Sequence, residues 1–401
     1  MTQGAPVTRW DTDFDVLSPE YVADPFRIWD ELRPTCPVAH TDRRGSTWLP
    51  TRYQDVVDLA HDIDHFSSTQ ISVIPFNGER PDEPILAYGI PPISADPPLH
   101  TWTRRLLLPW FSHRRVEGYE AMTRALCAEL IDGFVSEGRA DAAHDYAQQI
   151  PVRVIASILG VPSSLSDTFT GWVRDLLEFA DDPVRRARGA NGLVGFFVDE
   201  VGKRKTEPGD DLLSDLLHSQ SDDGQPVDER VVLGVAALVL IAGVDTTWSA
   251  IGSSLWHLAT HTEDRDRLVH DPAAMPMAIE ELLRAYSPVT MARVVTEDVD
   301  FVGCPMRAGD KVLLNFPGAN RDPEVFEDAD RVVLDRELNR HVAFGSGIHR
   351  CAGSNLARME LRVALEEWLH RIPEFSLADG AEVTWAGGQI RGPRQLPVVF
   401  R

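Results

Sequence analysis

One cysteine of this chain lies in a setting that suits a metal ligand. Residues 341–353 read His-Val-Ala-Phe-Gly-Ser-Gly-Ile-His-Arg-Cys-Ala-Gly, and the residues that follow, 354–369, are predicted to form a helix. Gly345 and Gly347 have no Cβ, so they permit a tight turn and the close approach of a flat ligand. A thiolate next to a helix N-terminus is stabilised by the helix dipole and by free amide N–H groups. Cys351 is therefore a candidate ligand for haem iron, because thiolate is one of the few axial ligands that proteins offer to haem.

The same stretch resembles the haem-binding loop of the cytochrome P-450 monooxygenases, Phe-Gly-x-Gly-x-His-x-Cys-x-Gly. Every fixed position of that motif is filled, by Phe344, Gly345, Gly347, His349, Cys351 and Gly353. A buried structural cysteine in a glycine-rich turn is the alternative interpretation, and the complete match weighs against it. The resemblance implies haem b, iron protoporphyrin IX, as cofactor, with Cys351 as the metal ligand and the other motif residues beside it.

The resemblance covers essentially the whole chain and implies a mainly α fold with a small β portion, a helix-rich triangular prism around a buried haem. We expect a single haem domain over residues 1–401, since no linker-like break divides the sequence. Hydrophobic periodicity predicts helices before residue 260 and short β-branched strands after residue 287. The predicted helices are 99–111, 113–136, 142–159, 163–180, 184–205, 209–218 and 226–259, and the predicted strands are 289–295, 299–302 and 311–314.

A second signal lies inside the longest predicted helix, which reads Ala-Gly-Val-Asp-Thr-Thr from residue 242. Gly243 lets a flat cofactor or dioxygen approach the backbone, and Thr246 can donate to the carbonyl of Ala242, which opens the helix locally. Ala242 and Gly243 are therefore candidate cofactor contacts. Asp245 and Thr246 match the acid–alcohol pair of the family, and the resemblance implies that they relay protons to dioxygen bound at the haem.

Glu281 and Arg284 are spaced i, i+3 and share one face of a predicted helix, where opposite charges can meet. Taken alone, such a pair is most often a solvated ion pair. In the family that the chain resembles, the matching Glu and Arg join an Arg-bearing loop in a buried ion network behind the haem. Removing one member of a buried network strands a charge and costs about 3–5 kcal/mol.

Haem carries two propionate carboxylates, which need cationic partners or hydrogen bonds in a protein interior. His100 and Arg104 lie one helical turn apart, and Arg293 and His349 follow later in the chain. All four match family positions that contact the propionates, whereas each one taken singly is more often an ordinary surface residue.

The substrate pocket is expected to be apolar. Seven prolines lie between Ser67 and Pro98 among apolar residues, and in the family this region covers the distal haem pocket. The lining is predicted to be Ile71, Ile74, Phe76, Leu86, Tyr88, Trp172, Leu176, Leu238, Val239, Ala242, Val289, Met291 and Ile390. Such a lining favours a hydrophobic small molecule oriented by few polar contacts.

Composition excludes several classes of protein. A net charge of -23 disfavours nucleic acid, because phosphate backbones require Lys and Arg stripes. The four cysteines lie far apart with no CxxC, which indicates neither a zinc site nor a disulfide framework and favours a reducing compartment. No signal pattern opens the chain, and the apolar run 235–244 is too short to span a bilayer. We expect a cytoplasmic protein with no membrane anchor.

Segments such as 95–112 resemble bacterial haem domains that are fused to a flavin and iron–sulfur reductase. No reductase follows in this chain, so electrons are expected from a separate ferredoxin or flavodoxin with its NAD(P)H-dependent reductase, unless the chain is an excised domain. These carriers are typically acidic, so the face around the cysteine ligand is expected to be basic. The candidate cations are Arg105, Arg114, Arg115 and Arg350.

The resemblance implies a monooxygenase that inserts one atom of dioxygen into a hydrophobic substrate, by hydroxylation or oxidative dealkylation. A peroxide-driven peroxygenase is a second reading, which the Asp245–Thr246 pair disfavours because peroxide already carries the protons that this pair delivers. A haem-thiolate binding or sensor protein without turnover is a third, and it would not need the pair.

Overall fold

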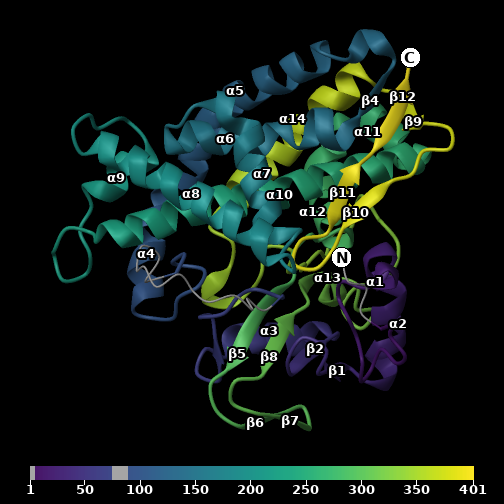
Figure 1. The fold of residues 1–401 in the computed structure, drawn as a ribbon. Coiled ribbons are helices and arrows are strands. Elements are labelled where there is room, and N and C mark those ends of the chain that lie inside the picture. Colours follow the sequence, from purple (N-terminus) through teal and green to yellow (C-terminus); the bar gives the residue numbers. More distant parts are fainter. Residues whose placement is uncertain (1–4, 75–88) are drawn as a thin grey trace.

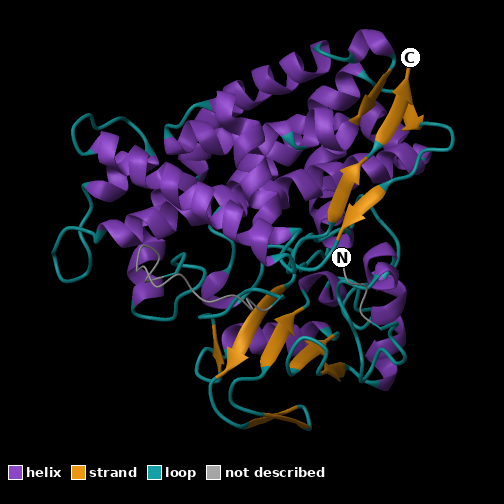
Figure 2. Ribbon diagram, in the orientation of Figure 1, coloured by secondary structure: helices purple, strands orange, loops and turns teal. Residues whose placement is uncertain are grey.

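The computed structural model describes residues 5–74 and 89–401 and shows a mainly helical body beside smaller β-sheets (Figures 1 and 2). Several helices begin directly after a residue whose side chain caps their N-terminus. The side chains of Asp182 and Asp228, for example, accept hydrogen bonds from the first backbone N–H groups of their helices. The helices are α1 Pro19–Ala23, α2 Pro25–Thr35, α3 Tyr53–His61, α4 Leu99–Leu107, α5 His113–Asp132, α6 Gln149–Leu159, α7 Ser166–Leu177, α8 Pro183–Arg204, α9 Leu212–Leu217, α10 Glu229–Thr260, α11 Thr262–His270, α12 Met275–Ala285, α13 Phe316–Ala319 and α14 Ser354–Arg371.

All seven helices predicted before residue 260 are present, and some are shorter than expected for local reasons. The predicted helix 99–111 divides into α4 and a 3₁₀ turn over Leu108–Phe111, where Pro109 supplies no backbone N–H. The predicted helix 142–159 begins with a π-helical turn over Ala142–Ala147 before α6. The predicted helix 209–218 starts only at Leu212, because the side chain of Asp211 caps its N-terminus.

Helix α10 is the centre of the helical body (Figure 1). It packs against α6, α7, α8 and α14, and most of its side chains are buried. By length and composition this 32-residue helix could cross a membrane, yet 78% of its most apolar window is buried inside the protein. The sequence predicted this helix over 226–259, but the apolar run 235–244 underestimated the length of its apolar part, most of which is buried in the protein core.

A five-stranded sheet lies beside the helices in the order β1-β2-β8-β5-β3 (Figure 2). Strand β8 pairs antiparallel with β5, with Arg293 opposite Val312, and parallel with β2. A three-stranded sheet β4-β12-β9 and two hairpins complete the β portion of the described residues. The strands are β1 Val38–Thr41, β2 Thr47–Pro50, β3 Phe66–Ser67, β4 Arg139–Asp141, β5 Met291–Val295, β6 Val299–Phe301, β7 Cys304–Met306, β8 Lys311–Leu314, β9 Phe375–Leu377, β10 Thr384–Ala386, β11 Gly392–Gln395 and β12 Pro397–Phe400.

Candidate active site

The cysteine loop is a tight turn that leads into α14. The backbone N–H of Cys351 donates to Phe344 O at 2.7 Å, which closes the turn. Gly345 and Gly347 have φ of 72° and 69°, a region that only glycine enters at low cost. A Cβ at Gly347 would lie 2.3 Å from Ala60 O, so α3 leaves no room for a side chain there. The loop conformation therefore depends on both glycines.

The cysteine thiol opens into a cavity of about 1700 Å³ that reaches from α14 to α10 and β5. The Cys351 side chain is accessible, but the surface around it is the cavity wall. Burial raises the pKa of the Cys351 thiol, while the Gly353 N–H and the cations Arg104, Arg350 and Arg358 act in the opposite direction. A cavity of this size exceeds the usual range for a small ligand alone and has room for a cofactor together with a substrate.

Four basic residues meet at one side of this cavity, and among the described residues the carboxylate that acts on His100 and Arg293 is that of Asp96. The rings of His100 and His349 lie 4.3 Å apart, centroid to centroid, although they are distant in sequence. Burial and the neighbouring cations lower the pKa of His349 to about 3, and burial lowers the pKa of Arg293 to about 10. Among the described residues no well-aligned hydrogen bond reaches the ring nitrogens of His100, although the Ile348 backbone acts on this ring, and Arg104 donates to a backbone carbonyl, that of Arg350. Such a cluster fits the two carboxylates of a haem.

Thr246 lies on the wall of the cavity. As predicted, its Oγ1 donates to Ala242 O, at 2.8 Å. Ala242 and Gly243 line the same wall. The requirement for glycine has a second cause, however, because a Cβ on Gly243 would lie 2.5 Å from Ile155 Cδ1. A side chain at this position would therefore require Ile155 on α6 to shift.

Asp245 is turned away from the cavity wall and toward the C-terminal hairpin. Its Oδ1 accepts from Arg394 Nη2 at 2.6 Å, and no hydrogen bond to Oδ2 is present among the described residues. Arg394 also pairs with Glu178 and stacks on Trp248 at 4.1 Å. Burial raises the pKa of Asp245 to about 6, although the Arg394 guanidinium opposes this shift. The carboxyl can therefore hold or release a proton near neutral pH.

Arg394 was not among the residues predicted from sequence. It lies 149 positions after Asp245, on β11, and no local pattern connects the two. Only the packing of β11 against α10 brings the guanidinium to the carboxylate.

The predicted ion network behind the cavity is present. Arg284 and Glu281 are fully buried and form two hydrogen bonds, each of 2.8 Å. Arg336 supplies the additional arginine, with its Nε 3.0 Å from Glu281 Oε2, and Asn339 donates to the same oxygen. Arg284 further donates to three backbone carbonyls, so it joins α12 to the loop before the cysteine motif.

The predicted substrate lining is brought together in large part. The cavity wall includes Ile71, Leu176, Leu238, Val239, Ala242, Val289, Met291 and Ile390. Two predictions are wrong. Ile74 packs into the N-terminal core with Val73 and Leu313, and Trp172 packs between α7 and α8 beside Phe169. Phe76, Leu86 and Tyr88 lie outside the described residues.

Sequence reasoning missed other parts of the wall. Leu356, Ala357 and Glu360 follow Gly353 at helical spacing along α14, and Leu107 and Phe111 follow Arg104 in the same way. A helical period counted from the predicted cofactor contacts could have found them. Arg186 on α8 and Lys311 on β8 also line the cavity, and neither carries a local signal.

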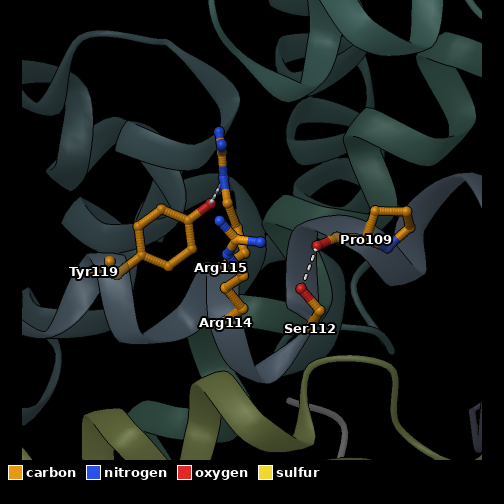
Figure 3. Close-up of a pocket in the computed structure, with 6 residues that line it drawn as sticks. Pro109, Ser112, Arg114, Arg115 and Tyr119 are labelled. Carbon is orange, nitrogen blue, oxygen red and sulfur yellow. Dashed lines mark hydrogen bonds between the residues drawn. The ribbon is translucent and has the colours of Figure 1, made fainter.

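A basic depression lies near the cysteine loop. It has a volume of about 580 Å³ and is lined by Pro109, Ser112, Arg114, Arg115, Gly118 and Tyr119 (Figure 3). Arg115 donates to Tyr119 Oη at 3.1 Å and stacks on Trp110. The depression is adjacent to the cysteine loop, because Asn355 Nδ2 donates to Phe111 O.

Comparison with known proteins agrees with this geometry. A family model described as Cytochrome P450 matches residues 184–378. The mycinamicin IV hydroxylase/epoxidase of Micromonospora griseorubida is 36% identical, over 93% of this chain and 94% of that protein. The vitamin D(3) 25-hydroxylase of Pseudonocardia autotrophica is also 36% identical, over 96% of each chain. The crystal structure of CYP109E1 from Bacillus megaterium in complex with testosterone superposes with a TM-score of 0.87, at 29% identity, over 95% of this chain and 99% of that one.

The cysteine loop, the cavity and the cation cluster occur in a chain that aligns with these enzymes over nearly its full length. The protein belongs to the cytochrome P450 family of haem-thiolate monooxygenases.

Proposed function

We propose that this chain acts as one haem domain that inserts an oxygen atom from dioxygen into a hydrophobic small molecule, by hydroxylation or oxidative dealkylation. The observation that carries the proposal is that the Cys351 thiol and the Thr246 hydroxyl lie on the wall of the same cavity. Bound through Cys351, the haem iron supplies the binding and reductive activation of dioxygen. His100, Arg104, Arg293 and His349 are the residues assigned to hold its propionates.

The residues of α10 handle protons in this proposal. Thr246 Oγ1 is held at the cavity wall by its hydrogen bond to Ala242 O. Asp245 has a pKa of about 6, so its carboxyl exchanges a proton near neutral pH. We assign Asp245 as the proton store and Thr246 as the hydroxyl that passes protons into the cavity. Arg394 positions the Asp245 carboxylate between turnovers.

The substrate is proposed to be an apolar molecule. The cavity wall includes Leu176, Leu238, Val289 and Met291, and this apolar surface favours a hydrophobic body. Two of the relatives are named for mycinamicin IV and vitamin D(3), and the similar structure was determined with testosterone. All three point to a medium-sized organic molecule.

Electrons are proposed to come from a ferredoxin or flavodoxin with its NAD(P)H-dependent reductase, in the cytoplasm. Arg114 and Arg115 line the depression beside the cysteine loop, and two further predicted cations, Arg105 and Arg350, belong to neighbouring segments. Arg105 pairs with Asp222, so its charge is partly balanced. We also propose that the chain is related to the haem domains of reductase-fused enzymes. Of the two sources of electrons, a fused reductase and a separate carrier, we favour the separate carrier.

The first test is the difference spectrum of the reduced holoprotein with carbon monoxide. A far-red Soret band is the expected result, since it is the signature of a thiolate ligand. A band at the ordinary imidazole or thiol position would show that Cys351 is protonated or not bound, and a protein without haem would overturn the proposal. Turnover supported by peroxide but not by dioxygen and reductant would favour the peroxygenase instead.

The second test separates turnover from binding. Thr246→Ala should consume reduced nicotinamide at a comparable rate but yield less product for each equivalent consumed, because the hydroxyl that passes protons is absent. Ser254→Ala is the matched control and should retain coupling, because Ser254 Oγ donates in the same way to the carbonyl four residues earlier on α10, at 2.8 Å, and is not among the residues that line the cavity. Unchanged coupling in Thr246→Ala would remove the assignment of this residue.

A further inference from the structure

Two basic side chains from distant elements meet over one short stretch of chain at the edge of the cavity. Lys311 on β8 donates through Nζ to Ser72 O at 3.0 Å and to Val73 O at 3.4 Å. Arg186 on α8 donates to Ser72 Oγ at 3.3 Å and to Ile74 O at 3.5 Å. Both side chains line the same cavity as Cys351. A cationic site is thus part of the predicted substrate chamber.

The charge of Lys311 is deeply placed. The residue is 8% exposed, and burial followed by the nearby charge of Arg186 lowers its pKa to about 8. The amine therefore remains mostly protonated at pH 7. An ammonium has three N–H donors, and the described contacts of Lys311 are two backbone carbonyls. Carbonyl oxygens offset desolvation but carry no net charge, so an anion would stabilise this group further.

The carboxylates of the cavity wall do not balance this charge. Among the described residues they are Asp96 and Glu360. Asp96 accepts hydrogen bonds from Ser67 Oγ at 2.6 Å and from Ser68 N at 2.9 Å. Burial raises the pKa of Glu360 to about 8, which keeps that carboxyl mostly neutral at pH 7. The wall thus has cations beyond those assigned to the propionates.

We propose that Lys311, with Arg186 beside it, binds a carboxylate of the substrate. The preferred substrates are then amphiphilic: an apolar body occupies the chamber, and one carboxylate lies at the Lys311 edge. An apolar wall and a single charged contact would orient such a molecule, so that carbons remote from its carboxylate meet the oxidising centre. This inference rests on the proposed function for the reaction, but the binding itself requires no turnover.

The test compares two ligands of equal length and shape, dodecanoic acid and dodecanamide, with the haem-loaded protein at pH 7. Affinity is measured by isothermal titration calorimetry and by the substrate-induced shift of the Soret band. The wild-type protein should bind the acid at least tenfold more tightly than the amide. Lys311→Met, which keeps the unbranched stem of the side chain and removes its charge, should bring this ratio close to one by weakening acid binding. Lys311→Arg should keep the preference.

Lys205→Met is the matched control, since Lys205 is an exposed lysine at the end of α8 that pairs with Glu229. It should leave the ratio as in the wild type. An equal affinity of the wild-type protein for acid and amide would overturn the inference without any variant. A preference for the acid that survives in both Lys311→Met and Arg186→Met would also overturn the inference. Loss of the carbon monoxide band would instead reject the proposed function, so the two failures can be told apart.

Discussion

Replacing Arg284 with alanine should leave little haem-loaded protein. The guanidinium is fully buried and makes five hydrogen bonds, two to Glu281 and three to the backbone carbonyls of Asn320, Ala329 and Arg331. Burial alone would raise the pKa of Glu281, but hydrogen bonds from Arg284 and its neighbours prevail and hold that pKa below its usual range. The pair is thus charged in the folded protein.

The expected loss of folding stability depends on which buried groups lose a partner in Arg284→Ala. Removing one member of a buried ion pair costs about 3–5 kcal/mol. Glu281 keeps Arg336, Asn339 and the Val333 N–H as partners, which reduces this cost. The three carbonyls lose their donor, however, and a buried unsatisfied group costs about 1–3 kcal/mol. Since a folded domain is stable by about 5–15 kcal/mol, the loss is a large part of the total.

The assay is thermal unfolding together with the haem content for each polypeptide, measured after identical expression. Arg267→Ala is the matched control, because Arg267 and Asp335 form an ion pair of the same 2.8 Å length at the surface. Exposed pairs contribute little, so the control should unfold like the wild type. Arg284→Lys keeps the charge but cannot reach all the carbonyls, and should be intermediate. Wild-type stability and haem content in Arg284→Ala would refute the reasoning.

Three further outcomes are expected. Arg394→Met removes the cation that opposes the effect of burial on the pKa of Asp245. This pKa should therefore rise above about 6, and the pH profile of product formation should shift to higher pH. An unchanged profile would show that Arg394 does not control the protonation of Asp245. Burial raises the pKa of Glu360 from an ordinary value of 4.5 to about 8. Between these two pH values the folded state keeps a proton that the unfolded chain releases. The free energy of unfolding therefore falls as the pH rises from about 4.5 to about 8. Glu360→Gln should therefore lose less thermal stability between pH 5 and pH 8 than the wild type, by thermal melts at both values, and parallel curves would contradict this. Arg114→Glu should slow reduction by an acidic ferredoxin at low salt, with the difference shrinking as salt is added, and equal stopped-flow rates would count against this face.

Local patterns of the sequence were sufficient for several features. The glycines and the cysteine of 344–353 specify a turn before a helix, and the structure has that turn with Gly345 and Gly347 in the left-handed region. The i, i+3 spacing of Glu281 and Arg284 predicts their contact on α12. The hydroxyl of Thr246 reaches the carbonyl four residues earlier because helix geometry alone brings them together.

Only the tertiary structure decided which side chains converge from distant segments. His100 and His349 meet at one side of the cavity, Arg394 reaches Asp245 from β11, and Lys311 meets Arg186 over Ser72. Hydrophobic periodicity identifies which face of a helix or strand is buried, but not whether that face contacts the protein core or the ligand cavity. Ile74 and Trp172 are apolar like their neighbours, yet they pack into the protein core rather than along the cavity.

The physical reason is the range over which each interaction acts. Turn conformations, helix caps and i, i+3 or i, i+4 contacts depend on neighbouring residues, so the sequence alone determined the motifs. The pKa of Asp245, the balance of charge around His349 and the shape of the cavity depend on burial and on charges that other elements supply. These properties exist only after α10, β5, β11 and α14 have packed together.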